Sequence, residues 1–286
     1  MNDVEAWNLS SIEQERQAFR RRQTIRSVLV GAISTLVFAI VVWITIVNTP
    51  GWDRVQQSFF NPETWVAAWP RVFDGFLLNI RVLLVAVVGV AVVATLTATV
   101  RTLRGPVFFP LRALAAGYTD LFRGLPLIIV LYLVGFGIPG LRLTDQRIPA
   151  ELLGTVALIL TYSAYVSEVL RAGIEAVHPS QTLAARSLGL SRGRSLRLVV
   201  LPQALRKVTP ALMNDVVSMQ KDVGLISVLG AVDAVRAAQI ETATAADFTP
   251  YVLAGVLFVL LAIPLIRLTD WVTARQRTRE QMGVLV

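Results

Sequence analysis

Two uncharged apolar runs, Val28–Val47 and Val82–Val100, constrain the fold of this chain more than any other feature. They are 20 and 19 residues long, and about 20 helical residues cross a bilayer core of about 30 Å. Hydrophobic residues make up 55% of the chain, against roughly 45–50% apolar residues in an average soluble domain. The sequence therefore predicts an all-α membrane protein.

Further runs are long enough to cross the bilayer: Leu111–Ile138, Leu152–Leu170, Val208–Gly230 and Phe248–Ile266. The last is uncharged, whereas the other three carry ionisable residues that are costly to insert into a membrane. Together with the first two runs, they predict six transmembrane helices.

The positions of the basic residues predict the orientation of these helices. With both termini in the cytoplasm, 19 of the 27 Lys and Arg residues lie in inner segments and five in outer ones. The five outer residues are Arg54, Arg71, Arg142, Arg147 and Arg236. Basic residues concentrate in the cytoplasmic loops of membrane proteins. The net charge of +8 therefore indicates inner membrane loops rather than binding of nucleic acid.

This topology divides the chain into segments in a fixed order. They are a cytoplasmic tail (1–27), an anchor helix (28–47), an external segment (48–75), a membrane core (76–270) with a cytoplasmic loop (175–202), and a second cytoplasmic tail (271–286). The long polar leader and the absence of a small-residue cleavage site favour a retained anchor over a cleaved signal peptide.

The polar stretch from Leu183 to Pro202 carries its own helix-capping signals, and we call it the capped segment. Ala184–Leu188 favours a helix, Gly189 favours a left-handed end, and Ser191 can cap a second short helix. Pro202 restricts the backbone where apolar sequence resumes. Built-in caps predict a folded unit rather than a slack connection, and hence a docking surface on the cytoplasmic side.

Motifs for catalysis are absent from the sequence. The only lysines, Lys207 and Lys221, do not follow a glycine-rich phosphate-binding loop. There is no Cys and only one His, His178, which excludes disulfides and disfavours a metal site. Transport or scaffolding is therefore favoured over an enzyme.

The capped segment resembles the EAA motif of ABC importer permeases. Ala184, Ala185, Gly189, Val199, Leu201 and Pro202 fall on its spacing. Four further tags resemble the polar amino acid branch, which includes histidine, glutamine, glutamate and arginine permeases. They are LFRGLPL at 121–127, AYVSEVLRAGI at 164–174, LPQAL at 201–205 and KDVGL at 221–225. The resemblance covers roughly residues 75–270.

The resemblance implies a five-helix permease core with an additional N-terminal helix. It also implies a pore of two permease subunits, as a homodimer or heterodimer, two ATP-binding subunits that carry ATP and Mg, and an external substrate-binding protein. No cofactor is expected on this chain itself. The implied ATPase-coupling residues are Ala184, Ala185, Arg186, Gly189, Leu190 and Pro202. Leu183 stands where the motif has its glutamate, so a charge at the ATPase surface is lost.

Ionisable residues within the apolar runs are candidates for the substrate path. The set is Asp120, Arg123, Tyr165, Glu168, Asp215, Lys221 and Asp222. Asp120–Arg123 and Glu168–Arg171 are each three residues apart on one helical face, so structural ion pairs are the favoured interpretation. Lys221 and Asp222 are adjacent and point to different faces, so they are expected to contact neighbouring helices or the substrate.

Two alternatives stay open at this stage. The same coupling loop serves importers of other small polar solutes, although the FRGLPL and KD tags disfavour them. A membrane scaffold or sensor that transports nothing is the other alternative, and co-purification with an ATPase would distinguish it.

Single cysteines can test the topology, because the chain contains no cysteine of its own. A cysteine at Ser58 should react with an impermeant maleimide in intact cells, and one at Ser191 only after permeabilisation. The opposite labelling pattern would invert the orientation.

Overall fold

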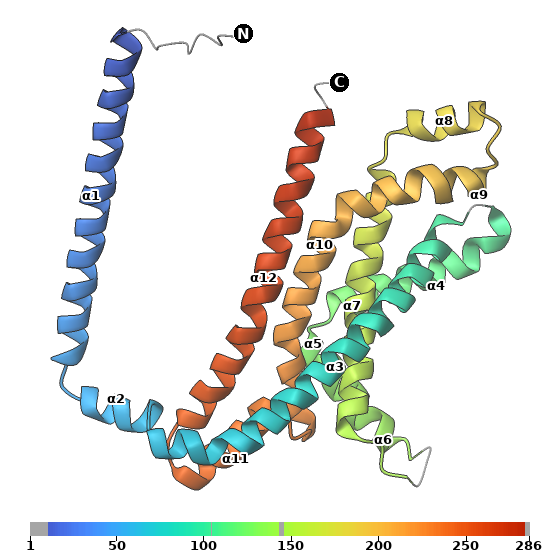
Figure 1. Ribbon diagram of the computed structural model, residues 1–286. Coiled ribbons are helices and arrows are strands. Elements are labelled where there is room, and N and C mark those ends of the chain that lie inside the picture. Colours follow the sequence, from blue (N-terminus) through green and yellow to red (C-terminus); the bar gives the residue numbers. More distant parts are fainter. Residues whose placement is uncertain (1–10, 104, 143–145, 284–286) are drawn as a thin grey trace, which may run out of the picture. The chain divides into compact units, whose positions relative to one another are not determined.

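A computed structural model describes residues 11–103, 105–142 and 146–283, and these residues form helices and connections without strands (Figure 1). Their contacts divide the chain between Gln57 and Ser58 into two compact units. Four helices are long and apolar enough to cross a membrane, and up to six spans result if each of two bent helix pairs counts as one. The prediction of a helical membrane protein is thus confirmed, and six is the upper bound for the described residues.

The first unit is dominated by α1 (Ser11–Val47), a single helix of 37 residues. Its apolar part, Phe19–Val47, buries no residue within the unit, as expected for a helix whose solvent is lipid. The expected anchor at 28–47 lies in this helix, and residues 11–27 of the expected tail continue the same helix. Residues 1–10 lie outside the described part. α2 (Trp52–Phe59) follows after a turn at Gly51.

The second unit is organised around α3 (Pro62–Thr102) and α7 (Ala150–Glu175), which pack on each other and cross at an angle (Figure 1). Asn61 caps α3, because its side-chain oxygen accepts from the N–H of Glu63 at 3.0 Å. Residues at steps of three and four along α3 are buried, among them Val72, Phe76, Leu83, Ala86 and Val90. This spacing places them on one helical face.

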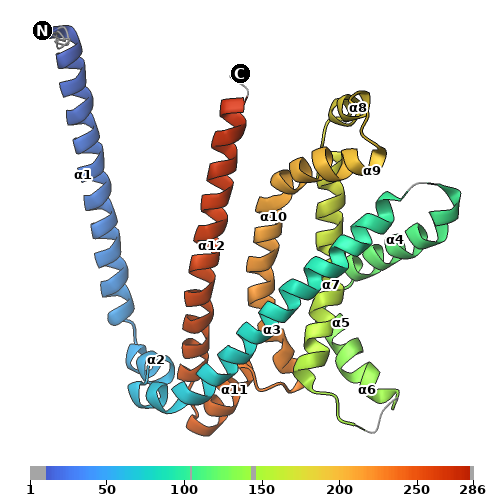
Figure 2. The ribbon, with the colours of Figure 1, turned by 45° about the vertical axis from the view of Figure 1, so that its right-hand side comes forward.

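The expected continuous helix at Leu111–Ile138 is wrong. α4 (Phe109–Gly124) follows η1 (Pro106–Phe108), and α5 (Leu127–Tyr132) starts a new direction. The helical stretches 106–124 and 127–140 are bent by 109° (Figure 2). Pro126 causes the break: it forces Leu125 into an extended conformation (φ −93°, ψ 135°) and offers no N–H for a continuing helix. α5 runs on through η2 (Leu133–Gly137) into α6 (Ile138–Gly140).

The expected helix at Val208–Gly230 is part of a longer helical stretch. α9 (Arg192–Ser195), η3 (Leu196–Val200) and α10 (Leu201–Asp222) follow one another directly, and η4 (Val223–Leu229) continues them to Gly230. Pro202 lies in the first turn of α10, which continues directly from η3. Its ring displaces the carbonyl four residues earlier, and the preceding turn η3 is widened to a π-helix, with the N–H of Leu201 bonded to the Leu196 carbonyl.

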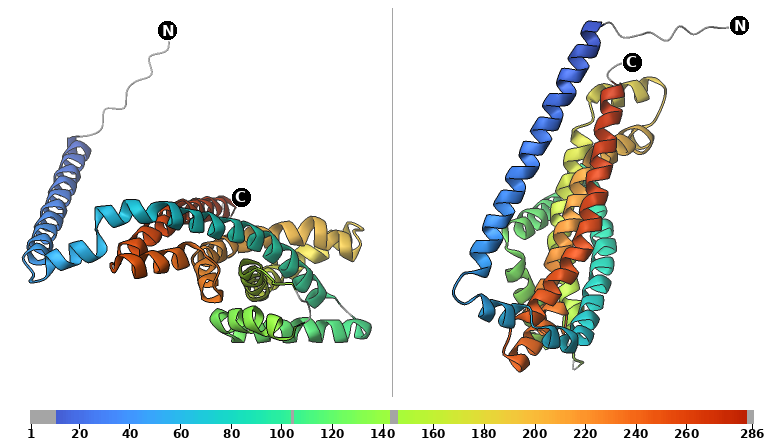
Figure 3. Two further views of the ribbon diagram at one scale, coloured as in Figure 1. Left: turned by 90° about the horizontal axis from the view of Figure 1, so that it is seen from below. Right: turned by 60° about the vertical axis from the view of Figure 1, so that its left-hand side comes forward.

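The remaining helices are α8 (Pro179–Ser187), α11 (Ala234–Ala245) and α12 (Thr249–Gly283). α12 includes the expected span Phe248–Ile266 almost entirely and continues to Gly283, into the region expected as a tail. It packs on α3, α10 and α11, and it runs beside α10 (Figure 3). One apolar core lies between α3, α5, α7 and α10, and another between α3, α11 and α12.

A buried polar cluster joins these two cores. The amide of Asn79 donates to the carbonyl of Val223 (3.2 Å) and to Asp233 Oδ2 (3.0 Å), and its oxygen accepts from the N–H of Ala234 (3.0 Å). Asp233 also caps α11 by accepting from the N–H of Arg236 at 2.9 Å. Both Asn79 and Asp233 are buried, and buried polar groups require such partners. One side chain of α3 thus serves both the end of α10 and the start of α11.

Gly75 lies one turn before Asn79 and brings α3 against the backbone of Asp233. A Cβ at Gly75 would meet the Asp233 carbonyl carbon at 2.5 Å. Gly75→Ala should therefore lower the free energy of unfolding by about 1–3 kcal/mol through overpacking, measured by thermal unfolding of the purified protein in detergent. Gly117→Ala in α4 is the control, because a Cβ there has no neighbour within 4 Å. Equal effects of both substitutions would contradict the close approach.

Candidate functional site

The start of α8 is fixed by its own sequence. His178 stands at the N-cap, and its Nδ1 accepts from the N–H of Ser180 at 3.2 Å. Pro179 occupies the first helical turn, where its missing N–H costs nothing. The helix expected at Ala184–Leu188 therefore starts earlier, at Pro179.

The end of α8 follows the prediction made for Gly189. This residue has φ +83°, in the left-handed region. The N–H of Gly189 bonds to the carbonyl of Arg186 (2.9 Å) and that of Leu190 to the carbonyl of Ala185 (3.2 Å). These two bonds form a Schellman motif, which satisfies the last carbonyls of a helix.

The second short helix is present, but its cap differs from the expectation. Ser191 precedes α9, yet its side chain makes no capping hydrogen bond. Instead its carbonyl accepts from the N–H of Ser195 at 2.8 Å. A helix therefore begins where it was predicted, but it continues into η3 and α10 instead of ending as a short helix, and the prediction of a serine side-chain cap is wrong.

α8 is attached to the helix that follows it. Ala185 is buried where α8 packs on α9 and η3 (Figure 2). Beneath, Val177, Val200 and Ala204 form a small core with Ile174. Two polar contacts add to it: Lys207 Nζ donates to the Ala176 carbonyl at 2.7 Å, and Gln203 Nε2 to Gln181 Oε1 at 3.4 Å. The capped segment is therefore joined to the ends of both α7 and α10.

The opposite face of the capped segment is open. Ala184, Arg186, Gly189 and Pro202 are exposed, and Leu190 is half-buried. Leu183 and Leu188 are 65% and 84% exposed. An outward face of small, basic and apolar residues is suited to a close contact with another protein.

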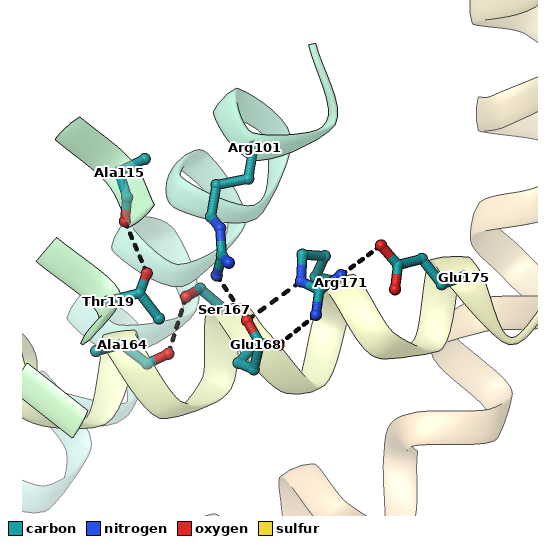
Figure 4. A network of polar contacts seen from close by, with 8 residues as sticks. All are labelled: Arg101, Ala115, Thr119, Ala164, Ser167, Glu168, Arg171 and Glu175. Carbon is teal, nitrogen blue, oxygen red and sulfur yellow. Dashed lines mark hydrogen bonds and ion pairs between the residues drawn. The ribbon is translucent and has the colours of Figure 1, made fainter. Parts of the chain in front are cut away.

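Glu168 is the centre of an ion-pair network at one end of α7 (Figure 4). It pairs with Arg101 of α3 (2.6 Å) and with Arg171 of α7, and Arg171 also pairs with Glu175. The side chains of Arg101 and Glu168 are only 17% and 21% exposed. The predicted Glu168–Arg171 pair is confirmed, and Arg101 makes it a connection between α3 and α7.

Asp120 and Arg123 do not behave as their spacing predicts. Both side chains are exposed, and they form no ion pair in the part of the chain that the structure describes. They lie in the last turns of α4, where the helix ends at Gly124. The hydroxyl of Tyr165 donates to the backbone carbonyl of Arg123 at 3.1 Å, so Tyr165 holds the end of α4 against α7.

The candidates on α10 have three different environments. Asp215 is partly buried, and its Oδ2 has no hydrogen-bond partner among the described residues. Asp222 accepts from the hydroxyl of Tyr162 on α7 at 2.7 Å. Lys221 is exposed. As predicted, Lys221 and Asp222 point different ways, and Asp222 contacts a neighbouring helix. A buried carboxyl oxygen without a protein partner is costly, so Asp215 stays a candidate for contact with a ligand or water.

Sequence reasoning missed Arg101, Tyr162, Asn79 and Asp233. Arg101 and Glu168 are 67 positions apart, and Asn79 and Asp233 are 154 apart, so no spacing rule connects them. A polar residue inside an apolar run was the available signal for Asn79. Within the described residues, no cluster of three or more His, Asp or Glu side chains could hold a metal ion.

Comparison with known proteins decides what kind of protein carries this site. Residues 105–278 match the family described as binding-protein-dependent transport system inner membrane component. The chain belongs to this family. It is a multi-pass membrane permease of the ABC importer type.

Individual relatives agree with this assignment. The chain is 32% identical to the arginine transport system permease protein of Bacillus subtilis (strain 168), over 68% of this chain and 87% of that protein. It is 33% identical to the probable glutamine ABC transporter permease protein of the same organism, over 67% and 87%. It is also similar to a crystal structure of an amino acid ABC transporter with histidines, with a TM-score of 0.67, 30% identity and coverage of 73% and 96%.

The ion-pair network of the permease gives a stability test. Glu168→Gln leaves Arg101 and Arg171 without their shared carboxylate in a mostly buried place. We expect a loss of about 1–3 kcal/mol in the free energy of unfolding, between the values for exposed and for buried pairs, measured by thermal unfolding in detergent. Glu175→Gln is the control, because Glu175 is 63% exposed and should cost less than about 1 kcal/mol. An equal effect of the two changes would show that Glu168 does not join α3 to α7.

Proposed function

We propose that this permease forms half of the translocation path of an ATP-driven importer for polar amino acids. The observation that carries the proposal is the attachment of α8 to one continuous but bent helical stretch, which we call the long helix. Its consecutive parts α9, η3 and α10 have 4, 5 and 22 residues, and the stretch bends sharply between α9 and the far end of α10 (Figures 1 and 2). This helix extends from the open face of the capped segment to the candidate substrate residues.

The long helix provides a mechanical route for coupling. An ATPase subunit that binds the open face of α8 displaces α8, and Ala185 passes the displacement to α9 and η3. Packed helices move as rigid bodies rather than deforming continuously. A shift at α8 therefore becomes a shift of Asp215 and Asp222, which lie toward the other end of α10.

The coupling residues then have distinct roles. Gly189 ends α8, Ala185 packs inward, and Ala184 and Arg186 face the ATPase. Leu190 closes the turn, and Pro202 widens the turn η3. Leu183, which replaces the glutamate of the EAA motif, is exposed and offers an apolar contact in place of a charge.

The candidate path residues have the chemistry that a polar amino acid requires. A zwitterion needs an anionic partner for its ammonium group and a cationic one for its carboxylate. Asp215 has a buried oxygen without a partner among the described residues, and Lys221 is an exposed cation further along α10. The relatives named for arginine and glutamine transport support a polar side chain on the substrate.

The topology and the assembly complete the proposal. Each bent helix pair is one span, which gives six spans with both termini in the cytoplasm, in accord with the distribution of basic residues. A second permease, identical or related, supplies the other half of the pore. Two ATP-binding subunits provide ATP and Mg, and an external binding protein delivers the amino acid. This chain itself performs no ATP hydrolysis.

Gly189→Val tests the coupling. A branched side chain disfavours the positive φ at Gly189 by at least about 1 kcal/mol, so the end of α8 should distort while the membrane core folds normally. We expect normal membrane levels and lost stimulation of the partner ATPase by the substrate-loaded binding protein. Gly117→Val in α4 is the control, because Gly117 is also exposed but has no positive φ and lies outside the capped segment. Equal stimulation in the two variants would overturn the role of the capped segment.

The same reconstituted vesicles test the substrate class. Uptake of labelled arginine, histidine, glutamine and glutamate should depend on ATP and on the binding protein, and at least one of them should be transported. If ATP hydrolysis is stimulated but none of these amino acids enters, another small polar solute is the substrate. If the chain does not co-purify with an ATPase, the scaffold alternative is supported.

A further inference from the structure

An apolar groove lies between the capped segment and the membrane core. It has a volume of about 250 Å³. Its walls come from the last turns of α3 (Thr95, Thr99), the end of α7 (Leu170) and the stretch from α9 to α10 (Leu196, Arg197, Leu205). The groove is thus next to the junction through which α8 is attached to the core.

The threonine hydroxyl groups in the groove need no hydrogen bond from a ligand. Thr95, Thr99 and Thr102 each donate to a carbonyl of their own helix, at 2.6, 2.7 and 2.8 Å. Their methyl groups remain available, together with the leucine side chains of the other walls. The groove therefore accepts a hydrocarbon chain without leaving a polar group unsatisfied.

Arg197 supplies the charge on the groove wall. Its side chain is exposed, and no carboxylate pairs with it among the residues that the structure describes. By contrast, Arg101, which is next to Thr102 on α3, forms an ion pair with Glu168. Arg197 is therefore available to bind an anion such as a phosphate, for which a guanidinium is well suited.

We propose that the groove binds one acyl chain of an anionic phospholipid, with the phosphate at Arg197. The α3 wall belongs to the last turns of an apolar membrane span, which ends at Arg101 and Thr102, so acyl chains and headgroups meet at this depth. The apolar side chains and threonine methyl groups that line this volume suit a hydrocarbon chain.

A lipid in this place contacts a mechanically important element. Leu196, Arg197 and Leu201 belong to η3 and to the start of α10, where the π-turn precedes Pro202. The acyl chain fills the space between this turn and α3. The bound lipid should therefore hold the capped segment in place relative to the membrane core.

Photolabelling of the assembled transporter tests the proposal directly. The complex is placed in nanodiscs of phosphatidylcholine, with a trace of phosphatidylglycerol that carries a diazirine in one acyl chain, and labelled residues are mapped by mass spectrometry. We expect labels on groove residues such as Thr99 and Leu205. Diazirine-bearing phosphatidylcholine should label them about fivefold less, the effect of one basic residue near an anionic lipid. Equal labelling by both lipids would overturn the anionic selectivity.

Two pairs of variants separate the charge from the groove. Arg197→Gln should lower labelling by phosphatidylglycerol about fivefold, whereas Arg194→Gln, also exposed and outside the groove lining, should not. Thr99→Phe should fill the groove and abolish its labelling, whereas Leu96→Phe, on the same helix but outside the lining, should not. Labelling that is the same in all four variants would overturn the site. So would a cysteine at Thr99 that cross-links to the other permease, because a protein chain would then occupy the groove.

Discussion

Close contact of α7 with its neighbours is the constraint on which the rest of the second unit depends. In lipid, helices gain little from burying apolar side chains, so association depends on tight van der Waals packing and small residues. A Cβ at Gly154 would meet Ile226 at 2.7 Å, and one at Gly173 would meet Val208 at 2.4 Å. The missing side chains of these two glycines thus allow η4 to pack closely near one end of α7 and α10 to pack closely near the other. α7 therefore positions both α10 and the η4 segment that follows it.

Polar side chains then fix the packing at defined places. Asn79 joins α3 to the start of η4 and to α11, and Glu168 joins α3 to α7. Such bonds have no water to compete with them in a membrane, so a missing partner is costly. Five buried side-chain atoms lack a partner among the described residues, and Asp215 Oδ2 is the one that belongs to an ionisable side chain. The contrast with the satisfied groups is what makes Asp215 a candidate for substrate binding.

The capped segment and the adjacent groove belong to one mechanical junction. Ala185, Val200 and Ala204 hold the segment to the core from within, while the groove leaves a space between η3 and α3. Packing is therefore incomplete at the place where the proposed coupling requires motion. An acyl chain in this space would make the stiffness of the junction depend on the surrounding lipid.

The sequence by itself determined the helical membrane class, the left-handed end of α8 at Gly189 and the permease family, because these depend on local composition, local backbone preference and motif order. It also contained the signal for the break at Pro126, although the apolar run Leu111–Ile138 outweighed it. Only the tertiary structure decided that Glu168 pairs with Arg101 and which partners Asp222 and Asn79 have, since these partners lie 60 or more positions away on other elements. It likewise decided that Asp120 and Arg123 stay apart, because both side chains have an exposed environment and no packing holds them together.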